Sequence, residues 1–244
     1  STCMIINFLF DIDGTLTPAR DSMDKEFDKM FGQWVYKQQN KSNKVFFVTG
    51  SDRQKTKSQV SESLLRLVDG VYQNSGNQLY IRNNLRWEKY WQVPESLIED
   101  LNKIVKKSKW YGKAENNIEY RRGETTAMPM MINFSTVGRS ANAVQRKEYF
   151  EWDKGKGERL DIVDQLSSKY TDVSFSIGGE ISIDIYPKGR DKSQVLSDLV
   201  GKTIFFGDRC NLGGNDYEIA TMSDTHYNVS GWQETKKIIS SNYS

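Results

Sequence analysis

Hydrophobic residues form short, nearly unbroken runs in the first and last thirds of the chain. Residues 4–10, 44–48 and 203–206 are such runs, and each ends in a turn sequence that contains Gly or Asp. An apolar run of this length, closed by a turn signal, is typical of a strand buried on both faces of a parallel sheet. We therefore predict three central parallel strands here.

Segments with apolar residues at every third or fourth position alternate with these runs. They cover about 22–39, 53–67, 193–199 and 232–240, and a further short strand or turn region lies at 71–80. Apolar side chains at this spacing share one face of a helix. Strands that alternate with helices form parallel sheets with right-handed crossovers. The pattern predicts a doubly wound α/β core with a Rossmann-like architecture.

The middle of the chain follows another pattern. Its predicted strands are 117–122, 130–135, 173–177 and 180–186, and its predicted helices are 95–107, 140–151 and 158–169. The last two strands are separated only by Gly178 and Gly179, which favours a short hairpin turn. We expect an α+β domain built on an antiparallel sheet at 82–187, inserted into a core formed by 1–81 and 188–244.

Composition narrows the possible functions. The 244 residues include 34 Lys and Arg against 32 Asp and Glu, a net charge of +2, which removes the usual electrostatic motive for binding nucleic acid. No run approaches the about 20 apolar residues of a membrane helix, and the start of the chain does not resemble a signal peptide. Cys3, Cys210 and His226 are too few for a disulfide scaffold or a zinc site. We expect a cytoplasmic protein without nucleic-acid or membrane partners.

The strongest chemical signal is Asp11-Ile12-Asp13-Gly14, directly after the first predicted strand. Ligands of open α/β sheets bind beyond the carboxyl ends of the strands, where Asp11 and Asp13 would project. Two carboxylates at this spacing can share a hard cation while one attacks phosphorus and the other transfers protons. An ordinary Asp-Gly turn is the alternative. The preceding strand and the Gly-Thr-Leu-Thr sequence that follows favour phosphoryl chemistry.

Three more predicted strand ends supply groups that phosphoryl transfer needs. Thr49 and Gly50 offer a hydroxyl and backbone amides for phosphoryl oxygens. Lys192 can offset the negative charge of the nucleophile and the phosphoryl group. Asp208 and Asp216 add carboxylates, and ligands that are all oxygen indicate Mg²⁺. Each feature alone also fits a turn or an exposed helix start, but their order along the chain predicts one site.

These four motifs resemble the haloacid dehalogenase (HAD) superfamily of aspartyl-phosphate enzymes. More narrowly, the chain resembles the eukaryotic-type phosphomannomutase family, which has the same split core and inserted cap. The segments that carry this resemblance are 10–17, 138–140, 175–179, 181–187 and 213–216. The resemblance implies reversible conversion of mannose 6-phosphate and mannose 1-phosphate for GDP-mannose biosynthesis, with Mg²⁺ and a glucose or mannose 1,6-bisphosphate activator. It also implies small hexose phosphates as partners and a homodimer formed through the cap.

The resemblance also assigns roles to single residues. It makes Asp11 the nucleophile and Asp13 the general acid/base, and it places Mg²⁺ on Asp11, the backbone of Asp13 and Asp208, with Asp216 as a further candidate ligand. Thr49, Gly50 and Lys192 would stabilise the phosphoryl group. The residues that it implies for binding the sugar phosphate are Arg20, Arg121, Arg139, Arg146, Ser182 and Asp184.

Elementary geometry agrees with several of these assignments. Ser182 and Asp184 alternate with isoleucines and therefore share one face of a strand. Arg121 alternates in the same way with Tyr120. Arg139 and Arg146 are seven residues apart, about two helical turns, so we expect them to point the same way. Arginines that converge on one place fit a doubly charged anion such as phosphate, although solvated surface charges are the alternative.

The sequence departs from the family pattern in places. Arg122 stands where the family often has Asn, and Arg-Cys-Asn-Leu at 209–212 replaces its usual continuation. Met222 falls about where an acidic ligand of a second, structural cation is expected, so we do not predict that second cation.

Two other functions remain open. A sugar-phosphate phosphatase of the same superfamily would share the first half-reaction, but water would resolve the acyl phosphate. A cap that binds a distal phosphate favours the mutase. A non-catalytic binding protein would keep the fold without needing both Asp11 and Asp13.

Overall fold

The computed structural model describes residues 4–244, so Cys3 lies outside the described residues. The chain forms two compact units. The first contains the chain up to Glu88, Arg190–Leu212 and Asp216–Ser244, and the second contains Lys89–Gly189 and Gly213–Asn215. The insertion is predicted to begin at residue 82, but β5 (Asn84–Glu88) pairs with its neighbour β4 and so extends the sheet of the first unit.

The first unit is built on a seven-stranded sheet with the order β11-β10-β1-β2-β3-β4-β5. Its parallel strands are β1 (Ile6–Phe10), β2 (Lys44–Val48), β3 (Gly70–Gln73), β10 (Lys202–Gly207) and β11 (Thr225–Asn228). β4 (Gln78–Ile81) and β5 are antiparallel. Phe8 and Phe10 of β1 belong to one hydrophobic cluster and Leu9 to another. Burial of both sheet faces explains the unbroken apolar runs of the central strands.

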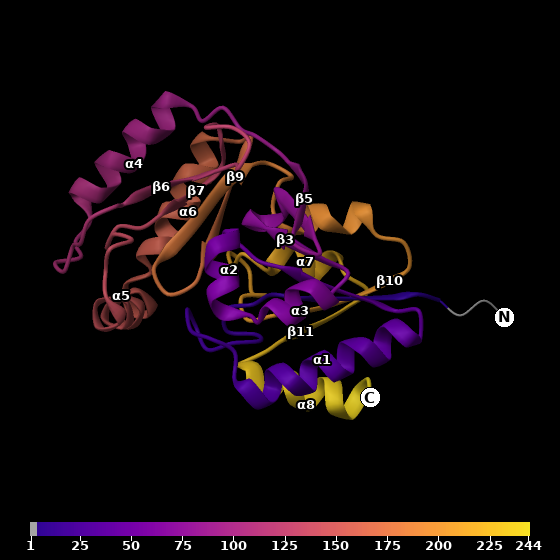
Figure 1. The fold of residues 1–244 in the computed structure, drawn as a ribbon. Coiled ribbons are helices and arrows are strands. Elements are labelled where there is room, and N and C mark those ends of the chain that lie inside the picture. The colour runs from indigo at the N-terminus through magenta and orange to yellow at the C-terminus, as the bar shows by residue number, and fades with distance from the viewer. Residues whose placement is uncertain (1–3) are drawn as a thin grey trace. The chain divides into compact units, whose positions relative to one another are not determined.

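Helices cover this sheet. They are α1 (Lys25–Asn40), α2 (Arg53–Gln59), α3 (Glu62–Leu67), α7 (Tyr217–Met222) and α8 (Trp232–Asn242), with short 3₁₀ helices η1 (Asn74–Gly76) and η2 (Lys192–Asp198). Figure 1 shows α1 and α8 side by side, and Trp34 Nε1 and Gln38 Nε2 each donate to the Tyr243 carbonyl at 2.8 Å. The single helix expected over 53–67 is two helices, because Val60 is extended and Ser61 caps α3.

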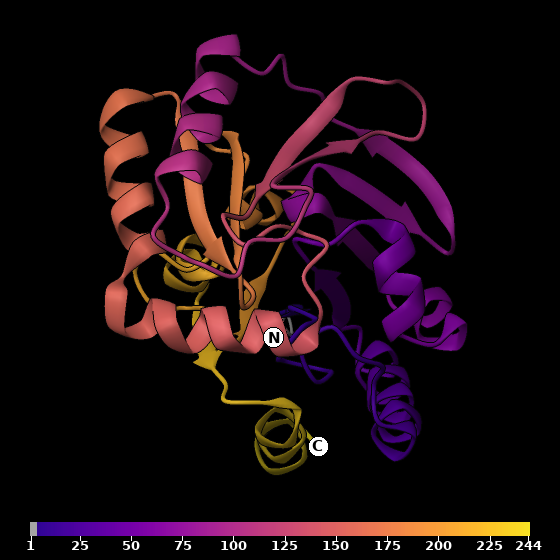
Figure 2. The same ribbon diagram turned by 90° about the vertical axis from the view of Figure 1, so that its left-hand side faces the viewer.

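The second unit has a four-stranded antiparallel sheet with the order β6-β7-β9-β8. Its strands are β6 (Ile118–Arg122), β7 (Pro129–Phe134), β8 (Val173–Gly178) and β9 (Ser182–Pro187), and its helices are α4 (Glu95–Lys107), α5 (Ala143–Lys156) and α6 (Glu158–Lys169). Figure 2 shows α4 and α6 side by side, and Asp100 of α4 accepts hydrogen bonds from Lys169 and Tyr170. Leu101, Leu166 and Ile185 lie in their shared core.

A short segment from late in the chain completes this unit. The Ile177 amide donates to the Gly213 carbonyl at 2.7 Å, and the Asn215 amide donates back to Ile177 at 2.8 Å. Residues 213–215 thus pair with β8. Among the helices of residues 4–244, none combines the length and hydropathy needed to cross a membrane.

Candidate active site

The Asp11–Gly14 segment begins where β1 ends and turns sharply. The Asp11 amide donates to the Phe206 carbonyl at 2.9 Å, which fixes the start of the loop, and the Gly14 amide donates to Thr17 at 3.0 Å. Gly14 has a φ of +72°, and a Cβ built there would lie 2.2 Å from Asp208 Oδ2. Only glycine permits this close approach. The glycine of the motif therefore lets the loop lie against a second carboxylate, that of Asp208, which directly follows β10.

Three carboxylates meet beside this loop. Each of Asp11, Asp208 and Asp216 contributes one carboxylate oxygen, and these three oxygens lie within 4.8 Å of one another. Burial, followed by the charge of Asp216, raises the pKa of Asp11 well above its usual value. The same two causes raise the pKa of Asp208 to about 6. Carboxylates this close resist ionisation together unless a cation balances them.

Lys192 supplies part of that balance. Its side chain is only 1% exposed, and its Nζ lies 2.9 Å from Asp11 Oδ1 and 2.7 Å from Asp216 Oδ1. Burial alone would lower the pKa of Lys192, but the charges of Asp11 and Asp216 outweigh it and raise that pKa. Lys192 is therefore charged, as its predicted role requires. Three ionised carboxylates and one ammonium leave two negative charges, which fits a divalent cation held by oxygen ligands.

The Asp13 side chain has other partners. Its Oδ2 lies 2.6 Å from Lys55 Nζ, and its Oδ1 accepts from Gln59 Nε2 and from the Arg20 amide. Burial raises the pKa of Asp13, but the charge and hydrogen bond of Lys55, with the other donors, bring the pKa below its usual value. Arg20 thus contacts Asp13 through its backbone, while its side chain is exposed. The carboxylate of Asp13 is held apart from the three-carboxylate cluster, so only its backbone stays a candidate metal ligand.

The Thr49–Ser51 loop is held from behind by the loop after β3. The Ser75 amide donates to the Thr49 carbonyl at 2.8 Å and the Asn74 amide to the Ser51 carbonyl at 2.9 Å. Within the loop, the Ser51 amide donates to Thr49 Oγ1 at 3.0 Å. Asn74 and Ser75 both have left-handed φ values, 52° and 63°, a conformation costly for non-glycine residues. The loop around Gly50 is therefore hydrogen-bonded on both sides to the loop after β3.

In the second unit, four of the predicted sugar-phosphate residues belong to one hydrogen-bonded group, which we call the arginine cluster: Arg121, Arg139, Ser182 and Asp184, joined by Glu119 and Asn133. Glu119 pairs with the Nε of Arg121 at 2.9 Å and of Arg139 at 3.1 Å. Arg139 donates to Ser182 Oγ at 2.8 Å.

The amide of Asn133 connects the two β9 residues of this cluster. Its Oδ1 accepts from Ser182 Oγ at 3.0 Å, and its Nδ2 donates to Asp184 Oδ1 at 2.9 Å. Asn215 donates to the other Asp184 oxygen at 3.3 Å. The alternation expected along β9 is therefore confirmed, because Ser182 and Asp184 reach the same partner.

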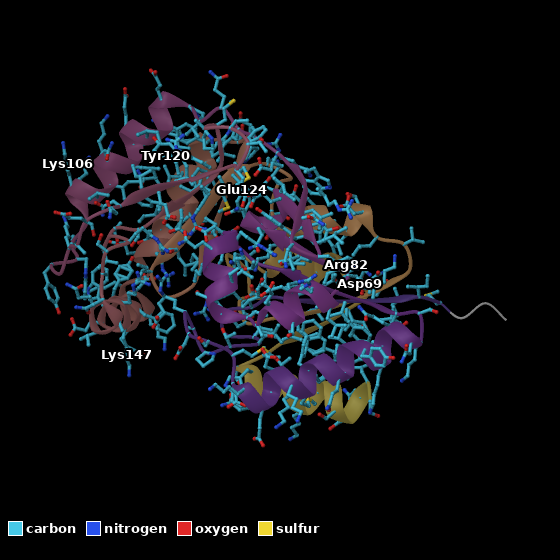
Figure 3. The ribbon with its side chains drawn as sticks, viewed as in Figure 1. Asp69, Arg82, Lys106, Tyr120, Glu124 and Lys147 are labelled. Atoms are coloured by element: carbon cyan, nitrogen blue, oxygen red, sulfur yellow. The ribbon has the colours of Figure 1, made fainter. Side chains whose placement is uncertain are left out.

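The expectation that Arg139 and Arg146 lie two turns apart on one helix is wrong. α5 begins at Ala143 with Asn142 as its N-cap, so Arg139 lies before the helix. Arg146 is buried and donates to the carbonyls of Arg139 and Ala141, each at 2.7 Å. It therefore supports the loop of Arg139. Figure 3 shows the adjacent Lys147 on the outer side of α5.

Sequence reasoning missed four partners of the predicted residues: Glu119, Asn133, Lys55 and Gln59. Lys55 and Gln59 are four residues apart on α2, a spacing that puts both on one helix face. Cys210 lies in a hydrophobic cluster, and burial raises the pKa of its thiol, so it is a poor nucleophile at neutral pH. Met222 is 64% exposed at the end of α7 and offers no oxygen ligand for a second cation.

Comparison with solved structures identifies the fold. Among solved structures, the chain is similar to the sucrose-phosphatase of Synechocystis sp. PCC6803 (TM-score 0.57, 14% identity, covering 99% of this chain and 90% of that one). It is also similar to a HAD subclass IIB sugar phosphatase (TM-score 0.54, 13% identity, covering 95% and 97%). The fold is that of the HAD superfamily, with a Rossmann-like core and a cap.

Sequence comparison is more specific. The sequence model of the family described as eukaryotic phosphomannomutase matches residues 32–244. The phosphomannomutase of Schizosaccharomyces pombe is 37% identical over 233 residues, covering 86% of this chain and 83% of the relative. That of Encephalitozoon cuniculi is 32% identical over 238 residues, covering 90% and 86%. The chain belongs to the eukaryotic phosphomannomutase family.

Proposed function

We propose that the protein is a phosphomannomutase that interconverts mannose 6-phosphate and mannose 1-phosphate through a hexose 1,6-bisphosphate. The observation that carries this proposal is the arginine cluster in a chain that also has the Asp11, Asp208 and Lys192 group. A monophosphate phosphatase needs one phosphate site, whereas a mutase must also hold the phosphate that is not being transferred. The first unit would be the catalytic core and the second unit the specificity cap. The family resemblance also implies a cytoplasmic enzyme that forms a homodimer through this cap.

Asp11 would be the nucleophile. A carboxylate oxygen of Asp11 attacks the phosphorus of the bisphosphate, the bond from phosphorus to the sugar oxygen breaks, and an aspartyl phosphate forms. Lys192, beside Asp11, would offset the charge that gathers there, and the Thr49–Ser51 loop would orient the phosphoryl oxygens. Mg²⁺, held by Asp11, Asp208, Asp216 and the backbone of Asp13, would add charge neutralisation when bound.

Asp13 would transfer the protons. In the first half-reaction its carboxyl group gives a proton to the departing sugar oxygen. In the second, Asp13 takes a proton from the sugar hydroxyl that attacks the aspartyl phosphate, which restores the Asp11 carboxylate. Lys55 and Gln59 orient the Asp13 side chain, and the Lys55 charge favours its ionised form between these steps.

The arginine cluster would bind the phosphate far from Asp11. Glu119 holds the guanidinium groups of Arg121 and Arg139 side by side, and two guanidinium groups suit a doubly charged phosphate. Arg146 would support the loop of Arg139 through its two backbone contacts. Ser182 and Asp184 would complete the site with polar groups for the sugar.

A HAD-type sugar-phosphate phosphatase is the second candidate, since both solved structures named above are sugar-phosphate phosphatases. One coupled assay separates the two. Mannose 1-phosphate is supplied with Mg²⁺, with and without glucose 1,6-bisphosphate, and both mannose 6-phosphate and free phosphate are measured. We expect bisphosphate-dependent mannose 6-phosphate with little free phosphate. Release of phosphate in step with substrate loss, independent of bisphosphate, would identify a phosphatase instead.

A further inference from the structure

Arg159 of the second unit has a set of contacts that the proposed reaction does not use. Its side chain is buried in the first turn of α6, where the residue is 4% exposed. Its Nε lies 2.6 Å from Asp153 Oδ2, and its backbone amide donates to Asp153 Oδ1 at 3.0 Å. Asp153 is on α5 and is also buried. A buried ion pair is costly to form, so its remaining hydrogen-bonding groups need partners.

Those partners are three backbone carbonyls of one turn. The Nη1 of Arg159 lies 3.1 Å from the Gly179 carbonyl, 3.1 Å from that of Ser182 and 3.4 Å from that of Gly178. These residues form the turn that joins β8 to β9. Gly179 has a φ of +60°, and a Cβ on Gly178 would lie 2.9 Å from Asp184 Oδ2. The turn is thus tight, close to Asp184 and held on the buried guanidinium group of Arg159.

The same turn leads into the arginine cluster. The Ser182 carbonyl accepts from Arg159, while Ser182 Oγ accepts from Arg139 and donates to Asn133. A hydrogen-bonded path therefore runs from Asp153 through Arg159 and the backbone of Ser182 to the guanidinium group of Arg139. No separate contact between Arg159 and a substrate is needed for Arg159 to affect that group.

We propose that Asp153 and Arg159 are positioning residues that set the orientation of Ser182 and, through it, of Arg139 in the distal phosphate site. The inference rests on the proposed function, because it assigns a purpose to the arginine cluster. A guanidinium group held in place before the ligand arrives loses less freedom on binding, which is worth up to about tenfold in affinity for one side chain. Asp153 and Arg159 would therefore act on substrate affinity without touching the substrate.

The test compares Arg159→Met, Arg159→Lys and Asp153→Asn in the full-length protein. KM and kcat for mannose 1-phosphate are measured with saturating bisphosphate, and unfolding temperatures are recorded for each variant. We expect KM to rise about tenfold in Arg159→Met, and less in Arg159→Lys, which keeps the charge but can donate to fewer carbonyls. Asp153→Asn keeps a partner for Arg159 and should also raise KM by less than Arg159→Met.

Lys169→Met is the matched control. It removes another ion pair of the same unit, between Lys169 and Asp100 at 2.7 Å, but one that lies between α4 and α6 and has no contact with the β8–β9 turn. A purely structural role would lower the fraction of active enzyme, and therefore kcat, while KM stays at the wild-type value. The control should keep the wild-type KM whatever its unfolding temperature.

An unchanged KM in Arg159→Met and Asp153→Asn would overturn the inference, as would an equal rise in Lys169→Met. If Arg159→Met does not fold, Arg159→Lys and Asp153→Asn decide the question by the same KM comparison. The wild-type protein separates this inference from the proposed function. If the wild-type enzyme hydrolyses mannose 1-phosphate without interconversion, both the proposed function and the positioning role are wrong. If the wild type is a mutase and the variants keep the wild-type KM, only the positioning role is wrong.

Discussion

Lys192 Nζ lies 2.9 Å from Asp11 Oδ1, and both side chains are buried. The charge of the ammonium group lowers the pKa of Asp11, but burial and the charge of Asp216 raise it by more. Asp11 follows β1, while Lys192 opens η2 far along the chain, so the pair forms only when the split first unit has assembled. The electrostatic environment of Asp11 thus depends on the folding of both halves of that unit.

The first prediction concerns Asp11. Asp11→Asn should abolish turnover, because an amide cannot form an aspartyl phosphate and because it removes one charge from the three-carboxylate cluster. Turnover of mannose 1-phosphate is measured on protein checked by circular dichroism and by mass spectrometry for deamidation. Asp21→Asn, which alters an exposed acid in the nearby loop, serves as the control. Retention of even a tenth of wild-type activity in Asp11→Asn would disprove the assignment.

The second prediction concerns Mg²⁺ and pH. Burial and Asp216 raise the pKa of Asp208 to about 6, and a protonated carboxyl group is a poor ligand. Mg²⁺ affinity should therefore fall as pH drops through about 6, approaching about tenfold per pH unit for one proton released on binding. Calorimetric titrations at several pH values between 5 and 8 measure this dependence. A flat affinity over that range would show that Asp208 is not a ligand.

Without Mg²⁺, the stability of the fold should depend on pH in the opposite direction to the Mg²⁺ affinity. An acid whose pKa is higher in the folded protein than in the unfolded chain destabilises the fold once it is ionised. That penalty is fully present above pH about 6 and decreases as pH falls below it, because Asp208 becomes neutral. Added Mg²⁺ should therefore raise the unfolding temperature more at pH 7.5 than at pH 5.5. Equal increases at both values would contradict this account.

The third prediction concerns Lys55. Lys55→Met leaves the half-buried Asp13 without its ion pair, so the remaining desolvation should raise the pKa of Asp13. Where Asp13 must act as a base, the acid limb of the pH–rate profile should move to higher pH. The lowered pKa of Asp13 also means that its ionised form stabilises the wild-type fold at pH values above its pKa in the unfolded chain. This stabilisation is lost as the pH falls through the lower pKa of the folded protein. Lys55→Met should lack this contribution at neutral pH.

The profile of kcat against pH is compared for the wild type, Lys55→Met and Lys57→Met. Lys57 is an exposed neighbour on the same helix, so its variant controls for the loss of one positive charge on α2. An acid limb that stays in place in Lys55→Met, or that moves equally in both variants, would remove Lys55 from the control of Asp13.

The sequence predicted much of the fold and the positions of the acidic residues for a simple physical reason. The carboxyl ends of β1 and β10 lie at one edge of the sheet because the two strands pair in parallel, so Asp11 and Asp208 had to come together. The strands that were missed, β5 and β11, lack an apolar run because each has partly exposed residues along its length. A run of apolar residues identifies strands that are buried on both faces of a sheet, but it does not identify partly exposed edge strands such as these.

The side-chain partners were harder to predict. Lys55 was not expected beside Asp13, because the sequence does not show which face of α2 turns toward the Asp11–Gly14 loop. Arg146 has the residue type of a phosphate ligand, yet it donates to two backbone carbonyls, since a loop packed before α5 needs those donors. Tertiary context, which a single sequence does not contain, decided both cases.

The last prediction separates mutase from phosphatase. Arg139→Ala should weaken binding of the distal phosphate directly, because Arg139 belongs to the arginine cluster. Loss of one charge-assisted contact costs about 2–3 kcal/mol, or about thirty- to a hundredfold in kcat/KM for mannose 1-phosphate. Arg146→Ala should act through the same loop, with an additional loss of stability because its guanidinium group is buried. Hydrolysis of a small phosphate ester, which has no distal phosphate, should change little in Arg139→Ala.

Lys147→Ala is the control for both variants. Lys147 is next to Arg146 on α5 but exposed, as Figure 3 shows, so its loss removes a positive charge without touching the loop of Arg139. The kcat/KM for mannose 1-phosphate and the rate on the small ester are measured on the same preparations. If Arg139→Ala affects both reactions equally and weakly, as Lys147→Ala should, the arginine cluster does not bind a distal phosphate. The phosphatase would then be the better account of the protein.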